Sequence, residues 1–313
     1  MTQPIRYVRP SQVDPLRLRL YQRAIWTAIV GNGVLVLAKG AAAWLSDSTA
    51  LLATTVDSAT DLAYTLFMAW GLWRSQQPAD DGHPQGHSRI EPLVSTVIAL
   101  MMGLAGSEVV RQALDRLRGE PAIFAWGWPA GILVGSALVK VAMYLMVRRL
   151  GREAHSPAIM ASAQDNLTDV ISSGTALVGV LAASWLHPQA DPLAALAVSV
   201  WIFRNAWGIL VENLGYLTGR AAKPELLEQI CAAARHVDGV MGVHRVIADY
   251  CGPQVRVELH VDLDGDIPFR DAHQISNAVR DAVEALDEVD LAFVHLEPSQ
   301  IHEDGGARED VWG

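Results

Sequence analysis

Long apolar stretches dominate the first two thirds of the chain. Six segments are mostly apolar, at residues 23–45, 49–73, 92–115, 122–147, 158–186 and 190–212. A helix needs about 20 such residues to cross the hydrocarbon core of a bilayer, and each segment reaches that length. The pattern therefore predicts an all-α bundle of six transmembrane helices over residues 18–220, preceded by an N-terminal segment at residues 1–17.

The pattern changes after Lys223. Val255, Val257 and Leu259 alternate with polar residues, which is the period of a half-buried strand. Amphipathic helices are predicted before this region, from residue 224, and after it, from residue 269, and a last strand is predicted in "VDLAFVHLEP". The order α-β-β-α-β over residues 221–300 predicts a soluble α+β domain with an antiparallel or mixed sheet. The polar residues 301–313 are expected to be disordered.

Composition and charge support this division. The 313 residues are 51% hydrophobic and 19% charged, with a mean hydropathy of +0.21, which is too apolar for an ordinary soluble protein. The formal net charge of -10 argues against nucleic-acid binding, because phosphate contacts need clustered Lys and Arg. Cys231 and Cys251 are too few for a disulfide framework, and we interpret both as reduced thiols.

The basic residues predict an orientation in the membrane. Connections rich in Lys and Arg stay on the cytoplasmic side, which places both termini in the cytoplasm. Arg116 and Arg118, after the third segment, are the exception. The residues that decide the orientation are Arg6, Arg9, Arg17, Arg19, Arg23, Arg74, Arg89, Arg148, Arg149, Arg152, Arg220 and Lys223. We expect an integral protein of a bacterial inner (plasma) membrane.

Two of the apolar segments contain paired carboxylates. Asp57 and Asp61 lie four residues apart in the second segment, and Asp165 and Asp169 repeat this spacing in the fifth. Residues i and i+4 share one face of a helix, so two such helices side by side present four carboxylates to one point. Four like charges in a low-dielectric site need a divalent cation, protons, or both in turn. The alternative is that these aspartates only bond neighbouring helices.

A polar loop between the second and third segments holds a second group. Asp80, His83 and His87 have the spacing of metal ligands, and glycines and a proline between them allow a tight loop. Carboxylate and imidazole ligands suit zinc-like ions. The alternative is a solvated loop whose histidines bind nothing.

A third group lies in the predicted soluble domain. His295 and Glu297 are two residues apart on one strand, so their side chains point to the same face. The alternative is a set of scattered surface histidines. The candidate residues are His244, His260, His273, His295 and Glu297.

At this point the sequence resembles the cation diffusion facilitator family, from about Leu18 to Pro298. The resemblance is carried by "NGVLVLAKGAAAWLSDSTALLATTVDSATD", "DDGHPQGHSRIE", "QDNLTD" and the α-β-β-α-β domain. It implies a six-helix secondary transporter, not an enzyme, with a cytoplasmic domain resembling a ferredoxin-like metallochaperone. It also implies a homodimer that exchanges a divalent metal ion for protons and uses no organic cofactor.

The resemblance also implies roles for the candidate residues. The four intramembrane aspartates, Asp57, Asp61, Asp165 and Asp169, match the family's transport site. Asp80, His83 and His87 match a cytoplasmic loop site of some members. The histidines of the soluble domain and Glu297 match metal positions at a dimer interface, with a possible regulatory role.

The metal is less clearly indicated. Zinc-type members resemble this chain except that they usually carry histidine where Asp165 stands, and the all-aspartate set is similar to the manganese-type branch. The loop and tail histidines are similar to the zinc and iron-type branch. Carboxylates suit manganese and imidazole suits zinc, although zinc also binds carboxylates well. We therefore favour manganese, then zinc (with cadmium or cobalt), then ferrous iron.

The expected mechanism is alternating access, in which the metal displaces protons from the aspartates and protons later reload them. One alternative is an intramembrane aspartyl protease, which needs one aspartate from each of two helices rather than two pairs. A second alternative is a metal sensor or scaffold of the same fold that does not transport.

Overall fold

The computed structural model describes residues 15–46, 49–118, 128–185 and 190–299. These residues form two compact units with the boundary between Leu214 and Gly215. Most of the predicted N-terminal segment, the predicted disordered tail and the start of the fourth predicted span at residues 122–127 lie outside the described residues. So does residue 186, where the fifth predicted span ends.

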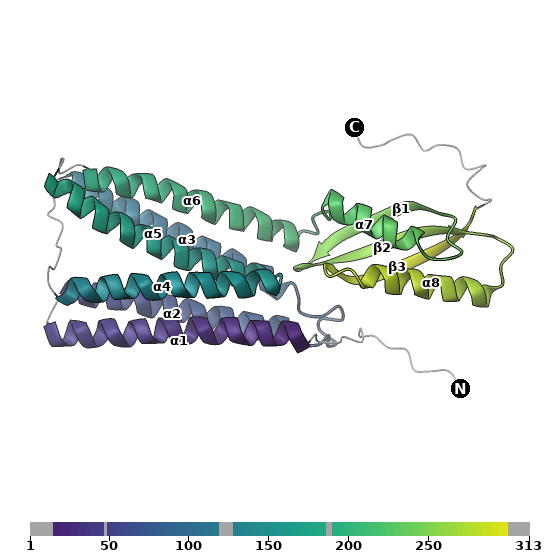
Figure 1. Cartoon of the computed structure of the whole chain (residues 1–313), viewed down its shortest axis with the longest axis horizontal. Helices are drawn as coiled ribbons and strands as arrows, with labels where there is room; N and C mark the ends of the chain where they lie inside the picture. Colours follow the sequence, from purple (N-terminus) through teal and green to yellow (C-terminus); the bar gives the residue numbers. More distant parts are fainter. Residues whose placement is uncertain (1–14, 47–48, 119–127, 186–189, 300–313) are drawn as a thin grey trace. The chain divides into compact units, whose positions relative to one another are not determined.

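The first unit consists of six long helices (Figure 1). They are α1 (Pro15–Ser46), α2 (Thr49–Ser75), α3 (Ile90–Leu117), α4 (Trp128–Glu153), α5 (Pro157–Trp185) and α6 (Ala190–Leu217). Helix α1 packs against α2 and α4, and α5 packs against α3 and α4. The predicted helices are confirmed, but several are longer than their apolar stretches. Helix α1 begins at Pro15 and includes Arg17, Arg19 and Arg23, because a helix continues through polar residues that an apolar pattern does not register.

Three of the described helices are long and apolar enough to cross a membrane by composition alone. They contain the stretches Pro15–Leu45, Ile90–Leu117 and Pro192–Leu217, with mean hydropathies of 1.6, 1.9 and 1.6. The outer surface of the bundle is apolar as well, since Trp26, Leu37, Leu138 and Trp207 are each between 64% and 75% exposed. An apolar exterior of this kind indicates contact with lipid.

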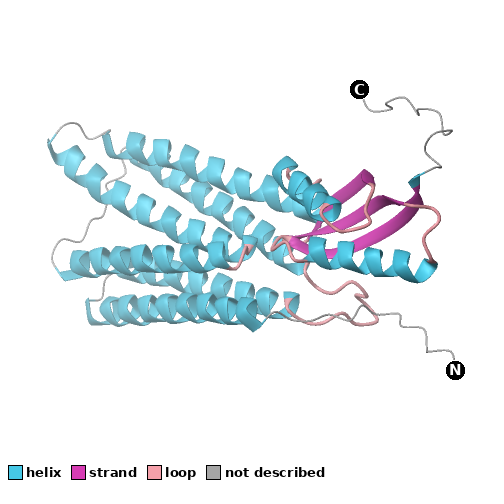
Figure 2. Ribbon diagram, turned by 45° about the vertical axis from the view of Figure 1, so that its right-hand side comes forward, coloured by secondary structure: helices cyan, strands magenta, loops and turns pink. Residues whose placement is uncertain are grey.

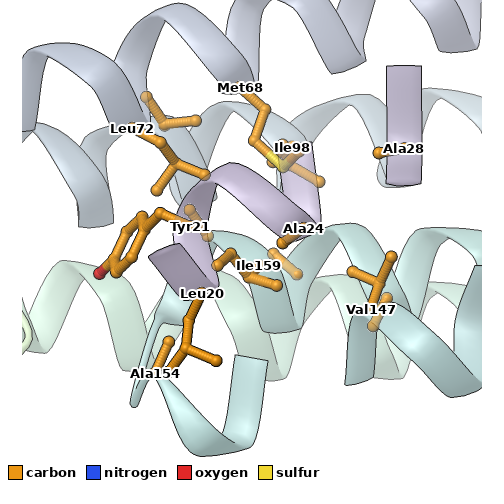
Figure 3. Packing of buried hydrophobic residues seen from close by; sticks show 14 of the residues in the cluster. Leu20, Tyr21, Ala24, Ala28, Met68, Leu72, Ile98, Val147, Ala154 and Ile159 are labelled. Atoms are coloured by element: carbon orange, nitrogen blue, oxygen red, sulfur yellow. The ribbon is translucent and has the colours of Figure 1, made fainter. Parts of the chain in front are cut away.

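The largest buried apolar cluster of the bundle lies where the N-terminal part of α1 packs against other helices (Figure 3). Tyr21 of α1, Met68 of α2, Ile98 of α3 and Ile159 of α5 belong to one buried cluster. Buried alanines, including Ala24, Ala28, Ala158 and Ala161, also belong to it. Small side chains let helix backbones approach closely, which is how helices associate in membranes.

The second unit is a small α+β domain (Figure 2). Its elements are α7 (Pro224–Arg235), β1 (Gly242–Cys251), β2 (Gln254–Leu263), α8 (Phe269–Glu284) and β3 (Val289–Pro298). This confirms the predicted order α-β-β-α-β. The sheet has the order β1-β2-β3 and is mixed, because β2 pairs antiparallel with β1 and parallel with β3.

The two faces of this sheet differ in character. Val255, Val257 and Leu259 of β2 are fully buried in one cluster with Ile230 of α7 and Val279 of α8. Helices α7 and α8 therefore cover this face. Successive strand residues point to opposite faces, so the polar residues of β2 project from the other side of the sheet.

Candidate metal sites

The described helices bring three of the four predicted intramembrane aspartates together. Asp61 comes from α2, and Asp165 and Asp169 come from one face of α5. One carboxylate oxygen from each lies within 4.8 Å of the others. The i, i+4 spacing on α5 places both of its carboxylates opposite α2. Three oxygens at this separation have the chemistry to surround a divalent cation.

The structure does not bring Asp57 into this group. Asp57 is exposed and lies four residues before Asp61, which corresponds to about 6 Å along the axis of α2. On α5 both aspartates belong to the group, whereas on α2 only Asp61 does. The two pairs that look equivalent in the sequence are therefore not equivalent in this conformation.

A lysine contacts two members of the carboxylate group. The Lys140 Nζ atom, from α4, lies 2.8 Å from Asp61 Oδ2 and 2.7 Å from Asp169 Oδ2. Its side chain is only 7% exposed. A second buried lysine, Lys39 of α1, donates a hydrogen bond of 2.8 Å to the Ser58 hydroxyl oxygen. Lys140 therefore supplies the positive charge that the two carboxylates need.

The position of Lys140 in the sequence is itself a signal for this role. Lys140 lies near the middle of the fourth apolar segment, and an ionisable residue at such a depth pairs with an opposite charge or faces the bundle interior. The aspartates of the second and fifth segments were the available anions. The spacing of residues did not reveal which of them Lys140 contacts.

The loop between α2 and α3 brings together Asp80, His83 and His87, whose ligand atoms lie within 4.8 Å of one another. Asp80 Oδ1 lies 3.3 Å from His83 Nδ1, and Asp80 Oδ2 lies 3.3 Å from His87 Nε2. The side chain of His87 is buried, while Asp80 and His83 are partly open to solvent. The arrangement offers one buried and two accessible ligands.

The electrostatics of this loop favour a cation. The backbone N–H of His83 donates to the carboxylate of Asp80 at 2.7 Å and holds the pKa of Asp80 below its ordinary value. Asp80 therefore stays ionised at neutral pH. The Nδ1 atom of His87 lies 3.4 Å from the carbonyl oxygen of Gln77, which can only accept a hydrogen bond. A proton on Nδ1 leaves the Nε2 lone pair facing Asp80, and two facing acceptors need a cation or a proton between them.

The exposed face of the C-terminal sheet carries the third group. Ligand atoms of His244, His260 and Glu297 lie within 4.8 Å of one another. Glu297 is central, with Oε1 2.6 Å from His260 Nδ1 and Oε2 3.6 Å from His244 Nε2. His244 Nδ1 also lies 2.8 Å from Asp262 Oδ1. Each imidazole thus has a carboxylate partner, as metal-binding histidines usually do.

Strand register explains why these residues meet. In the parallel pair of β2 and β3, His260 stands opposite His295 and Asp262 stands opposite Glu297. The register between β1 and β2 shifts between Val243 and Arg245, so His244 occupies an irregularity of the strand. Such bulges re-aim a side chain. Asp262 was not among the predicted ligands. Its i, i+2 spacing from His260 on β2, which places both side chains on one face, is the sequence signal that indicates it.

The other two predicted residues of this domain lie apart from the group. His295 is exposed, with its ring 4.9 Å from that of His260 and its Nε2 atom 3.7 Å from Glu297. His273 lies on the exposed side of α8, where its ring stacks against Phe269. Within one described chain, His295 borders the group and His273 does not join it.

Partly buried carboxylates between long apolar helices, together with a histidine-rich α+β domain, define a membrane protein that handles metal cations. Comparison with known families gives the same class. Residues 25–218 match the cation efflux transmembrane domain, and residues 222–299 match the cytoplasmic domain of cation efflux proteins. The chain belongs to this family, the cation diffusion facilitators. It is an integral membrane protein and a metal cation efflux transporter, and the members of this family are transporters rather than enzymes. The protease alternative is thereby excluded.

Individual relatives extend over nearly the whole chain. The uncharacterized transporter MJ0449 of Methanocaldococcus jannaschii is 31% identical over 90% of this chain and 99% of its own length. Metal tolerance protein 11 of Arabidopsis thaliana is 28% identical over 91% of this chain and 73% of its own length. The manganese efflux system protein MneS of Bacillus subtilis is 28% identical over 82% of this chain and 88% of its own length.

Proposed function

We propose that this protein exports a divalent transition-metal ion from the cytoplasm in exchange for protons, through the group of Asp61, Asp165 and Asp169 with Asp57 beside it. The observation that carries this proposal is the convergence of three carboxylates from two long helices within 4.8 Å. Helices α1 to α6 all span the membrane in this proposal, including those that are less apolar than α1, α3 and α6. Residues 18–220 form the transmembrane domain and residues 221–300 the cytoplasmic domain.

The contacts of Lys140 suggest how the site alternates between loaded and empty forms. In the described conformation the ammonium group contacts Asp61 and Asp169 and balances part of their charge. An arriving metal ion needs the same oxygens, so it must displace the ammonium group. Metal, protons and Lys140 then compete for one set of carboxylates. This competition allows the ion to leave on the other side of the membrane.

We propose manganese as the first candidate substrate, followed by zinc and ferrous iron. All the carboxylate ligands are oxygen donors, and oxygen ligands suit manganese better than they suit softer ions. A relative of similar length is a manganese efflux protein by name, which supports the same choice. Zinc stays a candidate because it lies above manganese in the general order of affinities.

The two histidine-containing groups serve regulation in this proposal. Asp80, His83 and His87 bind metal in the cytoplasmic loop. The sheet group of His244, His260 and Glu297, with His295 and His273 nearby, binds metal between two copies of the chain in a homodimer. Both termini lie in the cytoplasm of a bacterial cell, and the protein resides in the inner membrane.

Reconstitution in liposomes tests the proposal. Uptake of manganese, zinc, ferrous iron, cobalt and cadmium is measured in parallel, with and without an opposing pH gradient, while an internal dye reports proton movement. We expect uptake coupled to counterflow of protons, with manganese transported best. Metal binding without uptake would favour the sensor or scaffold alternative, and uptake without proton movement would remove the exchange mechanism.

A further inference from the structure

Two asparagines line the same pocket as the transport carboxylates. Asn32 of α1 and Asn166 of α5 border it together with Asp61 and Asp165. Asn32 is 4% exposed and Asn166 is 3% exposed. Neither belongs to the groups of histidines and carboxylates described above. Buried amides in an apolar bundle are costly unless both of their ends are used.

The orientation of the Asn32 amide is fixed by its neighbours. The Thr65 hydroxyl donates its single proton to the main-chain carbonyl oxygen of Asp61, at 2.9 Å. It can therefore only accept from Asn32, whose Nδ2 atom lies 2.7 Å away. The amide nitrogen must face Thr65, and the Oδ1 atom faces elsewhere. This Oδ1 atom is buried and receives no hydrogen bond among the described residues.

The same logic fixes the Asn166 amide. Its Nδ2 atom donates to the main-chain carbonyl oxygen of Ser162 at 2.9 Å. A carbonyl oxygen only accepts, so the amide cannot be turned around. Its Oδ1 atom is again buried without a hydrogen-bond donor in the part of the chain that the structure describes. Two residues that line the same pocket, on two helices, thus each hold an amide oxygen that can accept a hydrogen bond or a cation.

A buried acceptor without a partner calls for a ligand that can supply positive charge or a proton. The pocket is shared with Asp61 and Asp165, so a cation there is attracted by the carboxylates as well. Amide oxygens are neutral, hard donors of the kind that manganese and similar ions accept. Because they are neutral, they add ligands without adding charge that would hinder release.

We propose that Asn32 and Asn166 bind the transported divalent cation, with part of its water shell, through their Oδ1 atoms, and that they favour oxygen-preferring ions over softer ones. This inference rests on the proposed function of the carboxylate group. It assigns two further binding residues to that group and a contribution to metal selectivity that does not depend on the identity of residue 165.

The chain offers a matched pair of variants for Asn166. Thr168 already donates its hydroxyl to the carbonyl oxygen four residues earlier, at 3.0 Å, so threonine at 166 can keep the bond to Ser162 while losing the amide oxygen. The control is Asn213 of α6, which is also buried and donates Nδ2 to the Ile209 carbonyl oxygen at 2.8 Å. Its Oδ1 atom has no donor among the residues that the structure describes. Asn213 does not line this pocket.

The measurement is the affinity of the purified full chain for manganese and cadmium, with thermal unfolding recorded in parallel. Asn166→Thr is expected to weaken manganese binding by about 10- to 100-fold, the range for losing a supporting metal contact, and to weaken cadmium binding less. Asn213→Thr should leave both affinities unchanged. If Asn166→Thr alters only the unfolding temperature, as Asn213→Thr does, the pocket holds water alone and the proposal is overturned.

The role of Asn32 is tested by comparing a variant of Asn32 with a variant of Thr65, its hydrogen-bond partner. Asn32→Ala removes the amide oxygen and the bond to Thr65, whereas Thr65→Val removes that bond and keeps the oxygen. We expect Asn32→Ala to weaken manganese binding more than Thr65→Val does, and equal effects would show that Asn32 only supports Thr65. Asp61→Asn separates the two proposals. If it removes one class of metal sites while the asparagine variants keep that class at the affinity of the unaltered chain, only this inference fails. If Asp61→Asn removes no class of metal sites, both fail.

Discussion

The carboxylate group in the helix bundle and the histidine group on the C-terminal sheet differ in how their ionisable side chains are paired. In the bundle, two of the three grouped aspartates, Asp61 and Asp169, contact one buried lysine, and no imidazole is present in the group. On the sheet, each imidazole has its own carboxylate, at 2.6 Å for His260 and 2.8 Å for His244. In the proposed function, the first arrangement supplies an internal competitor for the metal ion, whereas the second orients ligands for it.

This difference fits the two roles that we propose. A transport site must release its ion, and a tethered ammonium group that returns to the carboxylates helps to expel it. A sensing site gains from pre-oriented imidazoles, because less conformational freedom is lost when the metal binds. The comparison predicts that changes in the bundle alter transport and that changes on the sheet alter binding without stopping transport.

The largest effect is expected from removing a carboxylate of the bundle. Asp61→Asn or Asp169→Asn keeps the side-chain shape but removes a charged ligand. The loss of transport should exceed the roughly 10- to 100-fold cost of losing an outer-shell partner. Asp115→Asn is the control, because Asp115 lies on α3 and pairs with Arg111 and Arg118 instead. Full uptake by either bundle variant in proteoliposomes would place the transport site elsewhere.

The second largest effect is expected from removing the charge of Lys140. Lys140→Met removes one partner of a buried ion pair, a change that typically costs about 3–5 kcal/mol, so the metal-free protein should unfold at a lower temperature. The variant should also bind manganese more tightly, because the internal competitor is gone. Lys39→Met is the comparison, since its ammonium group donates to a neutral hydroxyl oxygen and a smaller effect is expected. Weaker manganese binding by Lys140→Met would contradict the competition between lysine and metal.

A smaller change is expected from altering one ligand type. Asp165→His introduces into the bundle the imidazole that it lacks, and imidazole suits zinc better than manganese. The ratio of zinc to manganese uptake should rise about tenfold, on the order of one ligand's preference. Uptake of both metals from one mixture gives the ratio directly. An unchanged ratio would show that residue 165 does not select the metal.

The smallest effect on transport is expected from substituting histidines of the C-terminal sheet. His260→Ala together with His295→Ala should abolish metal binding to the C-terminal domain, measured by titration calorimetry as the loss of one class of sites in the full chain. Transport at saturating metal should persist. His236→Ala is the control, because this histidine lies at the end of α7 and bonds the Ala232 carbonyl oxygen. Loss of uptake in the double variant alone would show that the sheet group is needed for transport itself.

The sequence predicted the elements well because their patterns are local. The alternation of Val255, Val257 and Leu259 identified β2, and the apolar stretches identified the long helices. The convergence of Asp61 with Asp165 and Asp169 followed from i, i+4 spacing and the expectation that the second and fifth segments lie side by side. The metal-binding role of these groups stays a prediction.

The parts that could not be predicted depend on how elements meet. The different positions of Asp57 and Asp61 arise from the packing of α2, and no spacing distinguishes them. His244 reaches Glu297 because of an irregularity in the β1–β2 register, which alternation alone does not reveal. The unpartnered oxygens of Asn32 and Asn166 became apparent only when the donors around each amide were known.

The buried position of Lys140 has an electrical consequence. If α4 spans the membrane as proposed, any movement of the Lys140 ammonium group away from Asp61 and Asp169 carries a positive charge through part of the membrane field. Moving one elementary charge across 100 mV is worth about 2.3 kcal/mol. The step that exchanges lysine for metal should therefore respond to membrane voltage even when the ions exchanged are balanced in charge. The side chain that neutralises the empty site would then also act as a small voltage sensor.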